Sequence, residues 1–253
     1  MSTGSLNWSV VVTTAPRRYP KLTTTVDSLR SAGWESPVIF AEPDSPTCDA
    51  DTVTNATKLG VYGNWIKACR HGLDSGADVI MTVQDDVLFH PDSKSFAESA
   101  LWLDNSAFLS LYTPAHHSII SGNKKPWGIY PIHTKSLWGA MAMIWQPSIL
   151  NELINSELCK NWIGNIKRLK RSERIKKRRH PETIKNIDTL IGFFANQTGR
   201  KMYYVNPSFA QHISEDSSIG GRPAIGKRAA RFVVGCNGCP EASDIPVNGK
   251  ILS

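Results

Sequence analysis

Short apolar runs rich in β-branched residues recur through the first part of the chain, and they limit the possible folds more than any other feature. Trp8–Thr14, Pro37–Ala41 and Ala77–Val83 are nearly continuous runs of this kind. Strands that are buried on both faces have this composition, because helices cover both sides of the sheet that they form. The three runs therefore predict the central strands of a sheet with both faces covered.

Amphipathic stretches separate these runs. Leu22, Val26 and Leu29 recur with helical spacing before Gly33, which predicts a short helix. Asn64 is expected to cap a second helix, which ends before Gly76 and shares one apolar face among Trp65, Cys69 and Leu73. The order strand, helix, strand, helix, strand predicts parallel βαβ units with right-handed crossovers.

Further elements extend this α/β pattern to about residue 220. The expected strands and helices are Ala107–Tyr112, Trp138–Trp145, a helix that begins near Pro147, a helix over Ile187–Thr198, and a strand over Met202–Val205. We therefore predict one α/β domain over 1–220, with a mostly parallel sheet flanked by helices. Residues 221–253 contain Gly, Arg and Cys and are expected to form a C-terminal tail.

The positive charge of the chain is concentrated in one segment. The 253 residues carry a formal net charge of +7, and nine basic residues with one acidic residue lie between Lys167 and Arg179. The remainder of the chain is therefore close to neutral. A basic segment at 161–180 on a near-neutral domain predicts that any polyanionic partner binds at this segment.

Composition also excludes several classes. No run approaches the roughly 20 apolar residues of a membrane helix, and the first residues lack the basic and apolar regions of a signal peptide. We therefore expect a soluble cytoplasmic protein. Cys236 and Cys239 form a single CxxC without the second ligand pair of a structural zinc site, which leaves a Gly-rich turn with free thiols or a redox pair.

Polar residues follow the predicted strands at the edge where open α/β sheets bind ligands. The first run ends at Thr13-Thr14 and is followed by Arg17, the second ends before Glu42, and the third before Gln84-Asp85-Asp86. Adjacent carboxylates repel each other unless a cation or water compensates them, and hard divalent ions bind such carboxylates together with phosphate oxygens. The acidic pair predicts a metal site, with a helix N-cap or a solvated turn as the structural alternative.

Two later residues belong to the same hypothesis. His212 follows the strand at Met202–Val205, and an isolated histidine is either structural or a ligand. Asp188 opens the helix at Ile187–Thr198. A carboxylate at this position is either a first-turn residue stabilised by the helix N-terminus or a base that deprotonates a hydroxyl group within hydrogen-bond reach.

Taken together, these motifs resemble a GT-A-type, family 2-like glycosyltransferase. The resemblance covers about residues 8–220. It rests on TTAPR, the acidic end of the second strand, the helix that Asn64 initiates, QDD, WGAMAM, the Asp-headed IGFFANQTG helix and PSFAQH, in this order. It implies transfer of a sugar from a nucleotide sugar, most commonly a UDP-sugar, with Mn²⁺ or Mg²⁺ as cofactor. Gln84 departs from the acidic residue that the family usually has at the first position of its metal motif.

The resemblance also implies a role for each matching residue. Asp86 and His212 would hold the metal ion, and Asp188 would be the acceptor-activating base of an inverting enzyme. The donor nucleotide or its sugar would contact Thr13, Thr14, Arg17, Glu42, Asn64, Lys67 and Asp85. Trp138 and Gly139 would form the wall between donor sugar and acceptor.

The charge of the basic segment indicates which class of acceptor the protein could use. Its densest part, Lys176, Lys177, Arg178 and Arg179, favours a polyanion such as DNA, where phosphate contacts give salt-dependent binding. Compact phage enzymes of the resembled type glycosylate 5-hydroxymethylated pyrimidines, and His116, His117, Trp127 and Tyr130 would stack on a flipped base if they are not ordinary loop packing. A lipid-linked or surface glycan at an anionic membrane, or a plain solvated helix face, is the alternative for this segment.

Two other functions compete with glycosyl transfer. A nucleotidyltransferase uses a similar sheet and metal, but its first strand ends in a Gly-rich loop, and TTAPRRYPKL contains no glycine. A non-catalytic nucleic-acid-binding module would explain the basic segment but not paired carboxylates at the end of a buried strand. No obligate protein partner is indicated.

Overall fold

The computed structural model describes residues 6–114, 119–120, 123–124, 128–132, 139–162 and 187–213. In this part of the chain the elements alternate along the sequence as the apolar runs predict. They are β1 (Trp8–Thr14), α1 (Leu22–Ser31), β2 (Val38–Ala41), β3 (Thr52–Thr54), α2 (Gly60–Asp74), β4 (Val79–Gln84), β5 (Val87–Phe89), α3 (Ser93–Ser99), β6 (Ser106–Ser110), β7 (Ile119–Ile120), β8 (Asn123–Lys124), β9 (Gly128–Ile132), β10 (Ala142–Trp145), α4 (Pro147–Asn155), α5 (Glu157–Lys160), α7 (Ile187–Thr198), β11 (Lys201–Asn206) and β12 (Ala210–His212).

An eight-stranded mixed sheet forms the centre of the molecule, in the order β3-β2-β1-β4-β10-β6-β11-β9. The strands β3, β2, β1 and β4 run parallel to one another, and β6 is parallel to β11. The predicted α/β class with a mostly parallel sheet is confirmed. The predicted strand at Trp138–Trp145 is present as β10, but it runs antiparallel to both of its neighbours, β4 and β6.

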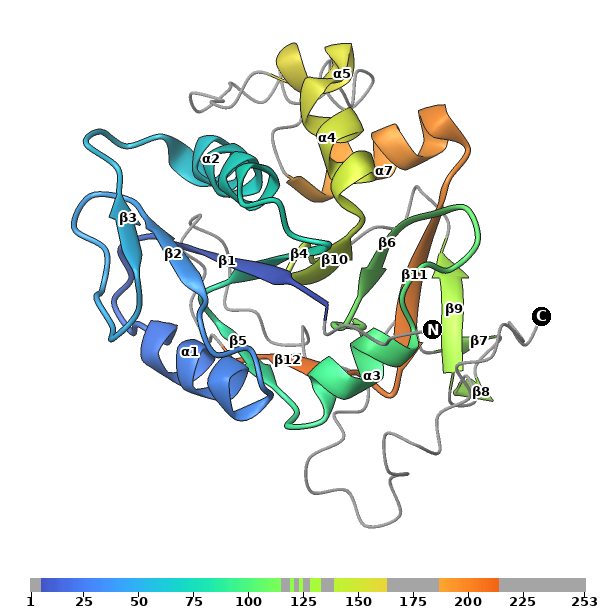
Figure 1. Cartoon of the computed structure of the whole chain (residues 1–253), viewed down its shortest axis with the longest axis horizontal. Coiled ribbons are helices and arrows are strands. Elements are labelled where there is room, and N and C mark those ends of the chain that lie inside the picture. Colours follow the sequence, from blue (N-terminus) through green and yellow to red (C-terminus); the bar gives the residue numbers. More distant parts are fainter. Residues whose placement is uncertain are drawn as a thin grey trace.

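Helices cover both faces of this sheet. Figure 1 shows α1 and α3 on one side, together with the small ribbon of β5 and β12, and α2, α4, α5 and α7 on the other side. Successive residues of one strand face opposite sides: Met81 packs in the layer with α1, and Ile80 packs in the layer with α4 and α7. This arrangement explains why the strand sequences are continuously apolar rather than alternating.

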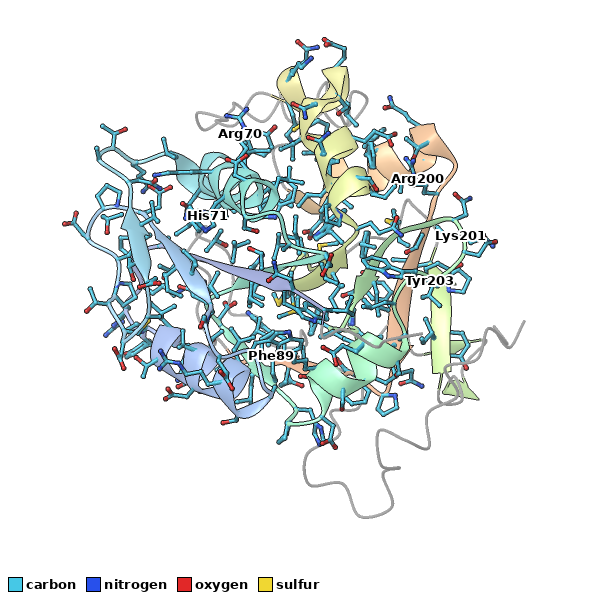
Figure 2. All side chains as sticks on the ribbon, in the orientation of Figure 1. Arg70, His71, Phe89, Arg200, Lys201 and Tyr203 are labelled. Atoms are coloured by element: carbon cyan, nitrogen blue, oxygen red, sulfur yellow. The ribbon has the colours of Figure 1, made fainter. Side chains whose placement is uncertain are left out.

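Aromatic rings fill the layer beneath the sheet. Phe89 of β5 lies there beside α1 (Figure 2), with its ring centroid 5.6 Å from that of Trp34. Phe96 of α3 stacks on Phe209 at 4.3 Å. These contacts anchor the β5–β12 ribbon, which continues directly from the acidic pair at the end of β4.

The predicted N-cap at Asn64 is wrong. The helix α2 begins at Gly60, about one turn earlier, and Asn64 is a buried residue in its interior. Its side-chain amide reaches backbone carbonyls of two neighbouring strands, which takes it away from the N-terminus of the helix. Within the described residues, no helix is both long enough and apolar enough to cross a lipid bilayer.

Candidate active site

Three strand ends bring the candidate residues to one edge of the sheet. The strands β2, β1 and β4 are adjacent and parallel, so their carboxyl ends coincide. Glu42 follows β2, Thr14 ends β1, and Asp85 follows β4. Sheet topology alone therefore assembles side chains that are distant in the sequence.

The acidic pair lies in the turn between β4 and β5, and both side chains are buried: Asp85 is 1% exposed and Asp86 4%. Asp85 accepts hydrogen bonds from the Thr14 hydroxyl at 2.5 Å, from Arg17 Nε at 3.1 Å and from Arg17 Nη2. Arg17 Nη1 donates to Asp86 Oδ2 at 2.6 Å. One guanidinium group thus spans both carboxylates.

His212 reaches the same carboxylate from the far end of the chain. The strand β12 pairs antiparallel with β5, and His212 lies opposite Val87 in this pair. Next to it, the Ile213 N–H donates to the Asp86 carbonyl at 2.9 Å. This pairing places His212 Nε2 3.0 Å from Asp86 Oδ2, across 126 residues of sequence. Arg17, Asp85, Asp86 and His212 form what we call the acidic cluster.

The two carboxyl groups of this cluster have opposite pKa shifts. Burial raises the pKa of Asp85 to about 6, although the Arg17 charge opposes this. Burial also disfavours the charged form of Asp86, but the hydrogen bond from His212 and the charge of Arg17 outweigh it and hold the pKa of Asp86 below its usual value. Asp86 is therefore the more readily ionised of the two carboxyl groups, and it accepts a hydrogen bond from His212.

Two buried carboxylate oxygens at this edge have no hydrogen-bond partner within the described structure: Asp86 Oδ1 and Glu42 Oε1. The other oxygen of Glu42 accepts from the Leu59 N–H at 2.9 Å. A buried acceptor without a donor costs free energy, so each of these oxygens is a position where a ligand donor or a cation would be stabilised. They flank the end of β1 on its two sides.

Asn64 and Lys67 belong to a different network beside this edge. Asn64 donates to the Phe40 carbonyl at 2.8 Å and to the Thr14 carbonyl at 3.3 Å. Its own oxygen accepts from Asn55 at 2.9 Å, and Asn55 accepts from Lys67 Nζ at 2.8 Å. We call Asn55, Asn64 and Lys67 the amide cluster; it joins α2 to the ends of β1 and β2.

Asp188 binds backbone rather than the acidic cluster. Its two carboxylate oxygens accept the Gly139 N–H at 2.8 Å and the Ala140 N–H at 2.9 Å. Gln84 holds the same segment from the other side, because its amide donates to the Ala140 carbonyl at 3.1 Å. This explains the departure at Gln84: an ionised acid there has no hydrogen to donate. The role of Asp188 as a base stays a prediction.

Tyr112 is a residue of this region that the sequence did not indicate. Burial raises its pKa to about 12, and the negative charges of Asp86 and Asp188 add to this effect. Gly139 packs on its ring with a φ of +78°, and a methyl group at position 139 would lie 2.9 Å from Tyr112 Cε1. Tyr112 therefore lies between the acidic cluster and the Asp188 segment, a proximity that no local pattern reveals.

Several predicted site residues lie outside the described residues. They are Trp138, Lys176, Lys177, Arg178 and Arg179, together with His116, His117, Trp127 and the tail with Cys236 and Cys239. Tyr130 is described: it lies in β9 and is 5% exposed, so it is ordinary packing and does not present its ring to a base. Thr13 donates to the Val83 carbonyl at 3.3 Å.

The residues at Asp86 fit a divalent ion that shares its ligands with a diphosphate. In the part of the chain that the structure describes, no group of three or more His, Cys, Asp or Glu side chains is arranged to hold a metal by itself. Asp86 Oδ1 would supply one ligand, and His212 would supply a second if its Nε2 no longer donated to Asp86. Mg²⁺ or Mn²⁺ commonly combines one or two protein ligands with phosphate oxygens. The metal assignment to Asp86 and His212 stays a prediction that this donor set allows.

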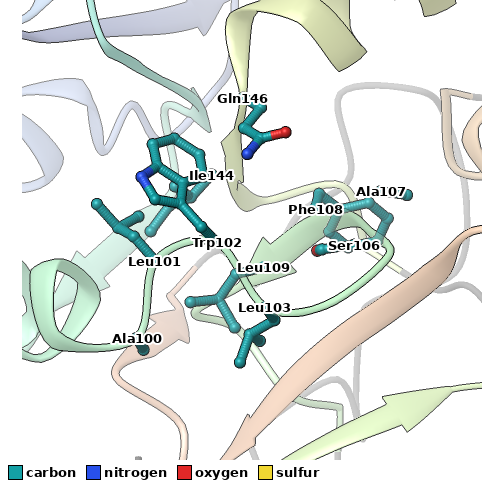
Figure 3. Close-up of a pocket in the computed structure, with 10 residues that line it drawn as sticks. All are labelled: Ala100, Leu101, Trp102, Leu103, Ser106, Ala107, Phe108, Leu109, Ile144 and Gln146. Carbon is teal, nitrogen blue, oxygen red and sulfur yellow. The ribbon is translucent and has the colours of Figure 1, made fainter. Parts of the chain in front are cut away.

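A separate pocket lies at the opposite end of the sheet (Figure 3). Trp102, Phe108, Ile144 and Gln146 contribute to its walls, beside the start of β6 and the end of β10. Its cavity volume of about 20 Å³ holds about one water molecule. This pocket is too small for a sugar or a nucleotide, so the strand-end edge is the better candidate.

No known family model matches the chain, and no curated protein matches its sequence. Solved structures match it in three dimensions. TarS 1-349 from S. aureus, in complex with UDP-GlcNAc, aligns with a TM-score of 0.50 at 12% identity over 84% of this chain. GalNAc-T7 with UDP, GalNAc and Mn²⁺ aligns with a TM-score of 0.50 at 11% identity over 83% of this chain. The chain has the GT-A fold.

The GT-A match covers less than two thirds of either solved structure, 60% of the TarS chain and 44% of the GalNAc-T7 chain. At these identities the likeness establishes the fold and leaves the activity to the residues of the site. In this GT-A domain the acidic cluster occupies the carboxyl edge of the sheet, which is where ligands bind in open α/β folds.

Proposed function

We propose that this protein transfers a sugar from a nucleotide sugar, with UDP-sugars as the first candidates, to an acceptor hydroxyl. The observation that carries the proposal is the pair of buried carboxylate oxygens, Glu42 Oε1 and Asp86 Oδ1, that find no hydrogen-bond partner in the described part of the chain, on either side of the end of β1. Glu42 Oε1 needs a hydrogen-bond donor, and Asp86 Oδ1 needs a donor or a cation. A nucleotide supplies base N–H and ribose hydroxyl donors, and its diphosphate brings a divalent ion.

Each residue of the edge has a part in this proposal. Glu42 Oε1 would accept a hydrogen bond from the nucleoside, while Glu42 Oε2 keeps its hydrogen bond from the Leu59 N–H. Asp86 and His212 would hold the divalent ion, which when bound supplies positive charge to the leaving diphosphate. Asp85 keeps Arg17 and Thr14 in place, because both already donate to it.

The acceptor side rests on Asp188 and the segment that it holds. We propose that Asp188, by fixing Gly139 and Ala140, shapes the wall between donor and acceptor, and that it takes the acceptor proton in an inverting transfer. For the acceptor we retain the prediction of a 5-hydroxymethylated pyrimidine in DNA, which rests on the basic segment alone. A saccharide at an anionic surface is the alternative.

The proposal is tested first on the donor. We expect Mn²⁺- or Mg²⁺-dependent binding of UDP by calorimetry, and slow release of UDP from at least one sugar in a panel of UDP-sugars. Glu42→Gln and Asp86→Asn should weaken these signals. Asp74→Asn, which removes the same charge at an exposed position at the end of α2, should leave them unchanged.

Failure of every nucleotide sugar to bind would overturn the proposal and favour a nucleic-acid-binding module. If a donor binds, the same sugar is offered to hydroxymethylated DNA, to unmodified DNA and to glycan acceptors, and the products are identified by mass spectrometry. Transfer to a glycan without transfer to DNA would remove the DNA prediction and leave the donor reaction intact.

A further inference from the structure

We propose that Arg17 is an internal counter-cation that competes with a divalent metal ion for Asp86 and thereby lowers the affinity of the site for free metal. This inference rests on the proposed function for the identity of the ion, and on the geometry of the acidic cluster for the competition. It assigns to Arg17 a role toward the metal ion in addition to contact with the nucleotide.

The division of hydrogen bonds between the two carboxylates supports the competition. Both oxygens of Asp85 are taken, one by Arg17 Nη2 and the other by Thr14 and Arg17 Nε. Asp86 has one oxygen without a partner among the described residues and one that accepts from Arg17 Nη1 at 2.6 Å. An incoming cation would therefore bind Asp86, next to the guanidinium group.

The charges in this buried place are nearly balanced without a metal. The side chains of Arg17, Asp85 and Asp86 are only 9%, 1% and 5% exposed, so water screens their charges weakly. Among the described residues, one guanidinium group against two carboxylates leaves one net negative charge here, with His212 as a further donor to Asp86. A divalent ion at Asp86 would overcompensate that charge and would repel Arg17.

The contact between Arg17 and Asp86 can be exchanged when a metal ion binds. Arg17 holds Asp85 through Nε and Nη2, and only Nη1 reaches Asp86. The guanidinium fork is rigid, so a small turn of the Asp86 carboxylate would break its contact with Nη1 while the bidentate contact of Arg17 with Asp85 is kept. A diphosphate that arrives with the metal ion would then accept the freed Nη1 hydrogen and offset the added positive charge. Metal should therefore bind weakly alone and more tightly together with the nucleotide.

Mn²⁺ titration followed by electron paramagnetic resonance of the free ion tests this without any turnover. In Arg17→Ala without nucleotide, the Kd for Mn²⁺ should fall at least about tenfold, because the guanidinium charge beside Asp86 is removed. The addition of UDP should then tighten Mn²⁺ binding less in Arg17→Ala than in the wild type. Arg18→Ala is the matched control, because Arg18 is exposed and lies over the Tyr19 ring at 5.2 Å.

Arg17→Lys guards against a variant that does not fold, since lysine keeps one positive charge but cannot span both carboxylates. We expect an intermediate Kd for this variant and a larger rise of its melting temperature with Mn²⁺ than in the wild type. An unchanged or weaker Mn²⁺ affinity in folded Arg17→Ala and Arg17→Lys would overturn the competition. If UDP-sugars still bind to the wild type in that case, the proposed function stands and only the role of Arg17 falls.

Discussion

Two buried polar clusters lie side by side at the carboxyl edge of the sheet, and they differ in one respect. In the amide cluster, every side-chain nitrogen and oxygen of Asn55 and Asn64 has a partner. In the acidic cluster, Asp86 Oδ1 has none among the described residues. A satisfied cluster stabilises the fold, whereas an unsatisfied one costs stability and is retained where a ligand completes it. We therefore expect the amide cluster to stabilise the fold and the acidic cluster to bind a ligand.

Neutralising Asp86 in the acidic cluster should have the largest effect on activity. Asp86→Asn keeps the shape of the side chain but removes its charge, and we expect the rate of transfer to fall about 10²–10³-fold because charge on the leaving group is no longer compensated. The melting temperature should also fall, because the ion pair with Arg17 and the charge-assisted hydrogen bond from His212 are weakened. The rate with the UDP-sugar that binds, and thermal unfolding of the same sample, measure both. Activity close to that of the wild type would contradict the assignment of Asp86.

In the amide cluster, a substitution should mainly lower the stability of the fold. Asn64→Ala leaves the Phe40 and Thr14 carbonyls and an Asn55 N–H without their partner, so we expect a loss of about 3–4 kcal/mol in the free energy of unfolding. Urea denaturation measures it, with the exposed Asn196→Ala in α7 as the control for the same chemical change. A loss of activity without a loss of stability would place Asn64 in the binding site.

Within the acidic cluster, Asp85 and Asp86 should contribute to the pH dependence of stability with opposite signs. Burial raises the pKa of Asp85 to about 6, above the value of about 3.9 in an unfolded chain. Between these values the folded protein holds a proton that the unfolded chain has lost, so this contribution to stability is present below pH 4 and is lost as the pH rises to about 6. The shift corresponds to at most about 3 kcal/mol.

Asp85→Asn should remove this loss, and the difference in unfolding free energy between wild type and variant should therefore change between pH 4 and 6 in EDTA. Asp86 contributes with the opposite sign. Its pKa is lowered, so its stabilisation is lost only as the solution becomes more acidic than the unfolded-chain value. A constant difference between wild type and Asp85→Asn across this range would show that Asp85 is not shifted.

The smallest effect concerns the segment that Asp188 holds. Gly139 and Gly76 both have a positive φ, +78° and +67°, but a methyl group meets Tyr112 only at position 139 and has open space at position 76. Both substitutions by alanine should destabilise, and Gly139→Ala should cost about 1 kcal/mol more than Gly76→Ala. Equal losses in chemical denaturation would mean that the Tyr112 ring moves aside without cost.

The sequence predicted the elements with local patterns well. The bounds of β1 and α7 agree with the predicted Trp8–Thr14 and Ile187–Thr198, because continuous apolar runs and helical spacing are local properties. The cap at Asn64 was wrong for a physical reason: amide side chains bind whichever backbone groups are nearest, and here those belong to β1 and β2. The antiparallel direction of β10 had no local signal either.

By itself, then, the sequence determined the buried strands, the helices between them and the acidic chemistry at the end of β4, since each depends on residues close together in the chain. Tertiary structure decided which groups meet there. Pairing of β12 with β5 brings His212 to Asp86 across 126 residues, and the position of Arg17 after β1 places its guanidinium group on both carboxylates. Strand partners and side-chain reach are long-range properties, and they place Arg17 and His212 against a pair of acids that are adjacent in the sequence.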